Sequence, residues 1–238
     1  MINPSNNPYI IKGLISGSDN RIISQDPTQK TAISIRRSNN QKTGLEFTWS
    51  CWLFISDLNN SSNTYQHVFS KGTMDFSESN GIANTNNAPG LYIAPGMGST
   101  TGSKNQNSIR VVMNNTGPVD NFNTEDTIID IGNIPLKKWF HVAIRMENTI
   151  LDVYINGVIA ERKVLQFVPK QNFNDIIVCQ HNGFNGNLSN LRYYNSALNV
   201  VQINNIVFWG PNLNANKLSG TKGGYHYLSS TWYTGLSV

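Results

Sequence analysis

Charged side chains are scarce in this 238-residue chain. Asp, Glu, Lys and Arg make up 13% of it, about half of the share in an average soluble protein. The formal net charge is only +4, and the basic residues are scattered. Proteins that bind nucleic acids usually show a clustered basic stripe and a recognisable reader motif. The sequence shows neither, so we expect no nucleic-acid partner.

Long apolar runs are absent as well. No run approaches the roughly 20 residues that a helix needs to span a bilayer, so we expect no membrane insertion. The first residues, MINPSNNPYIIKG, lack a basic segment followed by an apolar stretch of about 7–15 residues. We therefore expect no signal peptide and no export by the ordinary signal route.

Cysteine occurs only twice, as Cys51 and Cys179. Each lies in an apolar, strand-like run, where a cysteine usually behaves as a small buried hydrophobe. Neither has another Cys or a His at the spacing of a zinc site. We therefore predict two buried free thiols and no zinc site.

Short strand-like runs recur along the whole chain, bounded by Gly, Asn, Pro or Ser. They alternate apolar and polar residues or are rich in β-branched and aromatic ones. About a dozen such strands, separated by turns, favour a sandwich or a barrel. Only ALNVVQINNIV, residues 197–207, fits one face of a short helix. The strand-like runs are residues 9–15, 21–24, 31–37, 45–55, 65–71, 90–95, 108–114, 127–132, 139–147, 150–156, 158–164, 175–180 and 187–194.

Residues 137–164 show the most regular pattern. The apolar residues of WFHVAIRME alternate, which predicts an antiparallel strand with one face on a core. Asn156-Gly157 is a strong hairpin signal, because both turn residues must take positive φ. With a second reversal at Asn148-Thr149, the segment predicts a three-stranded meander whose turns fix the register of the strands.

Three segments lack periodicity, namely residues 73–89, 95–108 and 114–126. Loops of this length are usually functional or mobile, and both alternatives stay open. The C-terminal extension, residues 207–238, is dense in aromatic residues, whereas a disordered tail should be poor in them. We predict that it packs on its own domain or on a neighbouring chain. Its candidate partner-binding residues are Phe208, Trp209, Tyr225, Tyr227, Trp232 and Tyr233.

Catalytic motifs are missing. Glycoside hydrolysis generally needs two carboxyl groups about 5–10 Å apart. The nearest acids are Glu125, Asp126 and Asp130, but no further acid completes a same-face set on one strand. We therefore predict no enzyme activity and no catalytic residue. A structural role is expected for the histidines, none of which lies in a nucleophile motif: His67, His141, His181 and His226.

Binding residues are easier to nominate. A sugar site usually combines an exposed aromatic platform with amides and acids, and Phe184 is a further aromatic candidate. Calcium takes six to eight oxygen ligands and stays open as an alternative, although no Asp-x-Asp-x-Asp spacing exists. Its candidate ligands are the asparagine amides with Asp75, Glu78, Asp120 and Asp126. We assign no metal ligand and no cofactor. The candidate ligand-binding residues are Tyr92, Asp120, Phe122, Asp126, Asn185 and Asn190.

Four stretches resemble, in order, the concanavalin A-like, laminin-G-like jelly-roll domain: LEFTWSCWLFI, HVFSKG, KKWFHVAIRMENTILDVYINGV and FNGNLSNLRYYNSALN. The resemblance covers about residues 45–206. It implies an all-β, two-sheet antiparallel jelly-roll sandwich over residues 1–206, with a short helix and the aromatic extension 207–238. Many relatives carry acids where this chain has Ser189 and Asn190, which weakens a calcium site or an acidic sugar site there.

The extension, with GPN before Tyr-Leu-Ser-x-x-Trp-Tyr, resembles proteins of this type encoded by large DNA viruses. This resemblance implies a virion-associated protein, such as a minor capsid protein, assembled in the host cytoplasm. We therefore predict a non-enzymatic interaction module that binds other proteins of an assembly, capsid proteins among them. A lectin-like carbohydrate-binding protein is the alternative, and a glycoside hydrolase is a remote one.

Overall fold

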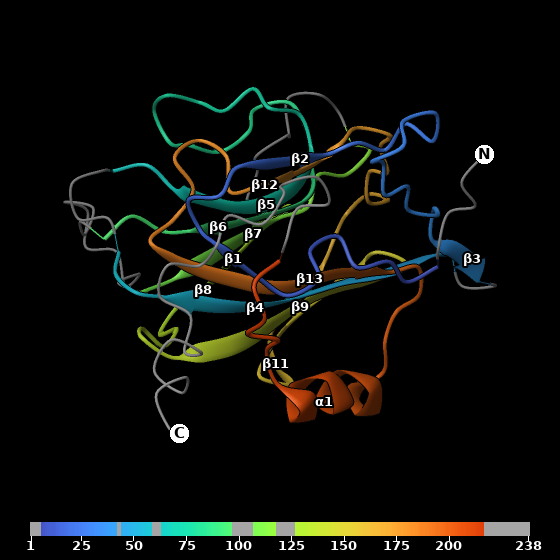
Figure 1. Ribbon diagram of the computed structural model, residues 1–238. Helices are drawn as coiled ribbons and strands as arrows, with labels where there is room; N and C mark the ends of the chain where they lie inside the picture. Colours follow the sequence, from blue (N-terminus) through green and yellow to red (C-terminus); the bar gives the residue numbers. More distant parts are fainter. Residues whose placement is uncertain (1–5, 42–43, 59–62, 97–106, 118–126, 217–238) are drawn as a thin grey trace, which may run out of the picture.

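The computed structural model describes residues 6–41, 44–58, 63–96, 107–117 and 127–216. These residues form two antiparallel sheets that pack face to face, with one α-helix outside them (Figure 1). Among them, no helix has the length and apolar character needed to cross a membrane. The all-β, two-sheet sandwich predicted from the sequence is confirmed.

The first sheet runs from β1 at one edge to β11 at the other, and β3 pairs with β4 beside this path. In spatial order its strands are β1 (Leu14–Ser16), β13 (Gly186–Tyr194), β4 (Gly44–Ile55), β9 (Trp139–Glu147), β10 (Ile150–Ile155) and β11 (Val158–Val164), with β3 at Asn39–Gln41.

The second sheet runs from β2 to β8. Its strands, again in spatial order, are β2 (Arg21–Ile23), β12 (Ile176–Val178), β5 (Gln66–Gly72), β6 (Asn87–Ile93), β7 (Ile109–Val112) and β8 (Ile128–Ile131). The chain crosses between the sheets after β1, β2, β4, β8, β11 and β12. Residues far apart in the sequence therefore meet in one core.

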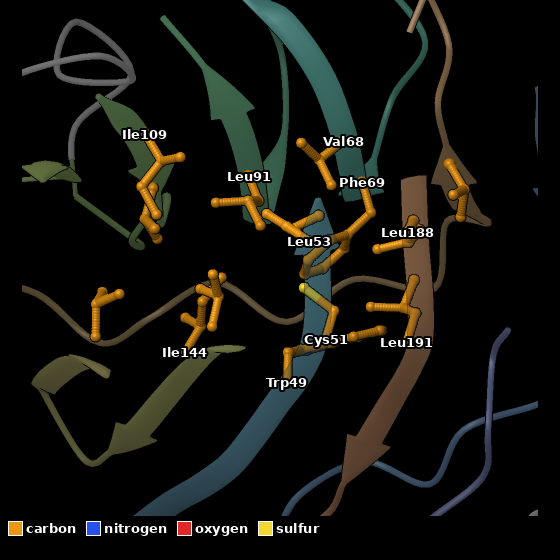
Figure 2. Close-up of a cluster of buried hydrophobic side chains, with 14 of the residues drawn as sticks. Trp49, Cys51, Leu53, Val68, Phe69, Leu91, Ile109, Ile144, Leu188 and Leu191 are labelled. Atoms are coloured by element: carbon orange, nitrogen blue, oxygen red, sulfur yellow. The ribbon is translucent and has the colours of Figure 1, made fainter. Parts of the chain in front are cut away.

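The core lies between the sheets (Figure 2). Phe140 and Ile144 on β9 and Trp49 and Leu53 on β4 belong to this core, and each is at most 2% exposed. Burying a large apolar side chain stabilises a fold by about 1.5–3 kcal/mol. The period-two pattern of the sequence therefore marks the residues that hold the two sheets together.

Both cysteines are buried and free, as predicted. Figure 2 shows Cys51 on β4 among the apolar side chains of the core. Burial raises the pKa of both thiols, that of Cys179 to about 12. The two sulfurs therefore stay protonated at physiological pH and pack as apolar groups.

The predicted meander is confirmed by β9, β10 and β11, which pair in sequence. Asn148 and Asn156 take φ of 57° and 50°, and Gly157 takes 85°. Asparagine and glycine tolerate this left-handed region better than other residues. The side-chain oxygen of Asn156 also accepts a hydrogen bond from the backbone N–H of His141 at 2.8 Å, which ties the turn to β9.

The outer face of β9 is covered by a second layer. His141 and Ala143 are 0% exposed although they point away from the core between the sheets. The helix α1 (Val200–Trp209) lies on this face (Figure 1), where Ile203 packs in one cluster with Ala143 and Tyr154. The first sheet is thus buried on both sides at the middle of β9, around His141 and Ala143.

The predicted short helix exists, and a reciprocal cap fixes its start. Asn199 Oδ1 accepts from Gln202 N, and Gln202 Oε1 accepts from Asn199 N, each at 2.9 Å. This capping box satisfies two backbone donors that the helix leaves open. The helix continues to Trp209, so the boundary drawn after residue 206 falls inside α1.

Residues 31–37, predicted as a strand, do not form one. Ile33 and Ile35 do pack against the core, as their alternation indicates. However, the side chain of Gln25 binds their backbone, donating to Ile33 O at 2.9 Å and accepting from Ile35 N at 3.1 Å. The Gln25 side chain thus makes backbone hydrogen bonds that a neighbouring strand would otherwise make.

The first of the three long loops folds back over the second sheet. Phe76 and Ile82 pack on its outer face with Tyr92 and Val112. Residues 73–86 therefore form a cover for this sheet. Most of the other two predicted loops, at 97–106 and 118–126, lies outside the described residues.

Candidate functional site

A cleft of about 430 Å³ opens on the outer face of the first sheet, between α1 and the N-terminal segment. We call it the sheet-face cleft. Its volume falls within the range of small-ligand sites, roughly 300–1,000 Å³. The lining residues that give it chemical character are Tyr9, Trp52, Asn190, Arg192, Tyr194 and Trp209.

Arg192 on β13 lies between two tyrosine rings. Its guanidinium carbon is 4.3 Å from the ring centroid of Tyr9 and 4.8 Å from that of Tyr194. Its Nε donates to the carbonyl of Asn7 at 3.1 Å, and its Nη1 donates to the Tyr9 hydroxyl at 3.2 Å. Cation–π stacking and hydrogen bonds together fix the guanidinium. The cleft therefore presents a cation in a set orientation between two aromatic faces.

Trp52 on β4 lines the same cleft and packs on His141, with ring centroids 5.3 Å apart. The Ser50 hydroxyl lies 2.8 Å from His141 Nε2. Burial lowers the pKa of His141 to about 4, so its imidazole is neutral at physiological pH. Its Nδ1 atom has no hydrogen-bond partner in the described part of the chain. This burial agrees with the structural role predicted for His141.

Asn190, a predicted ligand-binding residue, lies in the sheet-face cleft. The pairing of β13 with β4 shifts register between Ser189 and Arg192, and Asn190 takes φ of 50°. Such a bulge redirects a side chain relative to the regular pleat. The Asn190 Oδ1 atom accepts from Gly13 N at 3.0 Å, and the amide nitrogen remains a donor at the cleft.

Trp209 stands at the rim of the cleft, at the end of α1. It is 77% exposed, and the adjacent Phe208 is 81% exposed; the two rings meet edge to face at 5.6 Å. Phe208 does not line the cleft. The other four predicted partner-binding residues lie outside the described residues: Tyr225, Tyr227, Trp232 and Tyr233.

The first part of the C-terminal extension packs on its own domain. Asn214 O accepts from Leu14 N at 2.8 Å, Asn216 N donates to Leu14 O at 2.8 Å, and Ala215 bridges Leu14 in parallel. The Ser189 hydroxyl also donates to Asn212 O at 2.7 Å. Residues 212–216 thus extend the edge of the first sheet at β1.

No carboxylate lines the sheet-face cleft among the described residues, and Arg192 is the charged side chain there. Hydrolysis of a glycosidic bond generally requires a pair of carboxyl groups across it. The cleft can stack against a ligand and donate hydrogen bonds, but its described part holds no acid–base pair.

Three residues that the sequence suggested as ligand-binding candidates do not line the sheet-face cleft. Tyr92 is 0% exposed, and its hydroxyl donates to Asn87, so its ring has no surface on which a sugar could stack. Phe184 is 4% exposed and belongs to the core. Asn185 is exposed in another cleft, of about 690 Å³, beside Asp57 and His181. The structure therefore does not bring Asn185 and Asn190 into one site.

The other nominated acids do not line the sheet-face cleft or lie outside the described residues. Asp130 accepts two hydrogen bonds from Arg110, at 2.7 and 2.6 Å. The Asp75 carboxylate accepts from the hydroxyls of Thr73 and Thr85, whose hydrogen bonds help to lower its pKa despite partial burial. No group of three potential metal ligands occurs among the described residues. The predicted residues outside that part are Asp120, Phe122, Glu125 and Asp126.

Several cleft residues were not predicted, namely Tyr9, Trp52, Arg192 and Tyr194. A partial signal exists, because Arg192 and Tyr194 share one parity on β13 and so point to the same face. Tyr9 joins them from the other end of the chain. Its position there depends on the edge formed by β1 and β13, which local patterns do not reveal.

The described residues form a β-sandwich with a cleft on the outer face of one sheet. The chain belongs to the concanavalin A-like lectin/glucanase superfamily, whose laminin-G-type family model matches residues 26–204. The family resemblance found in the sequence is therefore confirmed. A comparison with characterised protein sequences finds no match.

Solved structures share the fold at low identity. The receptor-binding domain of botulinum neurotoxin mosaic serotype C/D is 13% identical, with a TM-score of 0.52 over 85% of this chain and 45% of that chain. The sialidase of Trypanosoma rangeli is 15% identical, with a TM-score of 0.50 over 86% of this chain and 28% of that chain. This chain thus spans less than half the length of either. These likenesses show the fold alone.

Proposed function

We propose that the protein binds carbohydrate in the sheet-face cleft and does not hydrolyse it. The observation that carries this proposal is the stack of Tyr9, Arg192 and Tyr194 beside Trp52 and Trp209. Aromatic faces supply apolar contact area, and a planar guanidinium supplies directed donors. A sugar ring presents an apolar face and a rim of hydroxyls, so the two surfaces are complementary.

Two further observations support binding without turnover. The superfamily unites lectins and glucanases on one fold, so sugar recognition is a property that this architecture accommodates. In the described part of the cleft, amide and aromatic side chains are present and carboxylates are not. Amides donate and accept hydrogen bonds without taking part in acid–base chemistry.

A glycan array probed with the full chain tests this proposal, followed by calorimetry with the strongest hit. Trp209→Ala should weaken the affinity about fivefold, because an aromatic contact of this kind contributes about 1 kcal/mol. Phe208→Ala is the matched control: it removes an equally exposed neighbouring ring that does not line the cleft.

The outcomes are distinct. Saturable binding that Trp209→Ala weakens and Phe208→Ala preserves supports the cleft as the site. An array without any saturable hit, or equal losses in both variants, contradicts it. Release of reducing ends from the bound glycan contradicts the absence of hydrolysis.

A second candidate function is assembly with other proteins, of which a minor capsid protein in a virion is the specific form. The observation that favours it is the exposed pair of Phe208 and Trp209 on a domain whose other large aromatics are mostly buried. Exposed apolar groups of this size often mark interaction sites. Phe208→Ala should then abolish incorporation into the particle and leave glycan binding intact. Incorporation at the wild-type level would contradict this candidate.

A further inference from the structure

A second pocket lies within the sandwich, apart from the sheet-face cleft. It has a volume of about 380 Å³ and shares no lining residue with that cleft. Phe47, Trp49 and Tyr193 line it from the first sheet, and the segments 25–38 and 170–175 contribute the rest of its wall with Lys71 and Ala88. We call it the inter-sheet pocket. Its volume is at the low end for ligand sites, so it suits one ring system rather than an oligosaccharide.

We propose that the inter-sheet pocket binds a small aromatic carboxylate. The aromatic wall gives the first reason. The ring centroids of Trp49 and Tyr193 lie 5.1 Å apart, and Phe47 stacks on Tyr193 at 6.4 Å. Flat rings prefer offset or edge contacts at such distances. A planar ligand therefore continues a cluster that the fold already holds in place.

Two polar groups in this wall give the second reason. Tyr193 and Trp49 line the pocket and are 4% and 2% exposed. The Tyr193 hydroxyl and the Trp49 indole N–H are hydrogen-bond donors, and a ligand oxygen in the pocket would accept from them.

The charge of the wall gives the third reason. Lys71 is 4% exposed, and within the described part of the chain its ammonium donates to neutral oxygens alone, namely Asn172 O at 3.1 Å, Asn172 Oδ1 at 3.3 Å and Asn174 O. Burial lowers its pKa to about 8, although the charge of Asp175 opposes the shift. A buried cation without an ion-pair partner favours a nearby anion.

The other charged side chains at the pocket, taken together, also favour an anionic ligand. Arg37 lies over the exposed ring of Phe173, with its guanidinium carbon 5.4 Å from the ring centroid. Basic side chains outnumber acidic ones, which attracts an anion and repels a cation. The charged lining residues are Lys71, Arg36, Arg37 and Lys170, against Asp26 and Asp175.

The proposal is tested by titrating the full chain with 2-naphthoate. Binding is measured by tryptophan fluorescence and by calorimetry. 2-Naphthalenemethanol has the same ring system without the charge and should bind at least about tenfold more weakly. Decanoate, an aliphatic carboxylate, tests whether the apolar part of the ligand must be aromatic. No binding of 2-naphthoate at millimolar concentration, or equal binding of the alcohol, overturns the proposal. If decanoate binds more tightly than 2-naphthoate, the proposal that the ligand is aromatic is overturned.

Two variants locate the site. Tyr193→Phe removes one hydroxyl and Arg37→Gln removes one exposed charge, and each should weaken 2-naphthoate about fivefold. Lys138→Gln removes an exposed charge outside the pocket and Trp209→Ala alters the sheet-face cleft, so both should leave the affinity unchanged. Unchanged affinity in Tyr193→Phe and Arg37→Gln, with wild-type thermal unfolding, overturns the assignment.

Discussion

The Oγ atom of Ser50 lies 2.8 Å from the Nε2 atom of His141, and both side chains are buried on the outer face of the first sheet. Burial lowers the pKa of His141 to about 4. The pKa of His67 is lowered to about 3 by burial and by the charge of His181. The fold therefore holds two imidazoles in the neutral form.

This relationship predicts acid sensitivity. As the pH falls below 6.5, the unfolded chain takes up protons on His67 and His141 while the folded chain does not, so the free energy of unfolding falls down to about pH 4. Between pH 6.5 and 4.5 we expect His141 alone to account for a loss on the order of 2–3 kcal/mol. Urea unfolding at a series of pH values measures this slope.

His141→Gln keeps a polar partner for Ser50 and removes the titration. Its unfolding free energy at pH 7 should be lower than that of the wild type, but its slope between pH 6.5 and 4.5 should be shallower. Asp26 and Asp75 have pKa values below 3.8 and so do not contribute within this window. A slope as steep as that of the wild type would show that His141 is protonated in the folded state.

Asp152 on β10 is a buried carboxylate between two arginines. Its carboxylate accepts from Arg145 at 2.9 Å and from Arg162 at 2.6 Å, and it is 0% exposed. Removing it takes one of two acidic partners from Arg145, which is 14% exposed and also pairs with Glu147, whereas Arg162 is 54% exposed and stays solvated. Asp152→Ala should lower the free energy of unfolding by about 3 kcal/mol, measured in urea. Glu161→Gln, on the exposed face of β11, is the control and should change it by less than about 0.5 kcal/mol.

Gly157 in the β10–β11 turn has φ of 85°, and an added Cβ would lie 2.1 Å from Asn204 Oδ1 on α1. An L-residue in this conformation costs about 1–2 kcal/mol. Gly157→Ala should lower the melting temperature accordingly. At Gly132 an added Cβ would meet nothing within 4 Å, so Gly132→Ala should melt with the wild type. Equal melting of both variants would mean that the turn is not held in this conformation.

The sandwich could be predicted because its determinants are local. Alternation on β9 marks the inward face through Phe140 and Ile144, and Asn156-Gly157 marks a turn by its own conformational preference. The strand predicted at 31–37 failed for the opposite reason. Whether Ile33 and Ile35 pair with a strand or with the side chain of Gln25 depends on the tertiary structure.

The sheet-face cleft was harder to predict than the strands, because its residues come together only in the tertiary structure. Tyr9 and Arg192 come from opposite ends of the chain, and Trp52 reaches the cleft from β4. Asn190 was predicted from its residue type, since an amide can bind a ligand. Tyr92 was nominated as an aromatic platform on which a sugar could stack. The loop at 73–86 covers that face, and the strand pattern contains no information about this.

The two cysteines allow a final prediction about the rigidity of the core. Cys51 is 1% exposed and Cys179 is 0% exposed, and burial raises the pKa of both thiols. Thiolate is the reactive form. A disulfide reagent such as DTNB should therefore react with neither thiol in the folded chain and with two per chain in urea.

Two substitutions at Cys51 test separately how the volume of the thiol and its apolar character contribute to stability. Cys51→Ala leaves a small void and should lower the free energy of unfolding by about 1 kcal/mol. Cys51→Ser keeps the volume but places a hydroxyl among apolar side chains, at a cost of about 1–3 kcal/mol. The serine variant should therefore be the less stable in urea. If DTNB reacts with the native chain at the rate of a free thiol, β4 opens locally, and the core that positions Trp52 and Trp49 is not rigid.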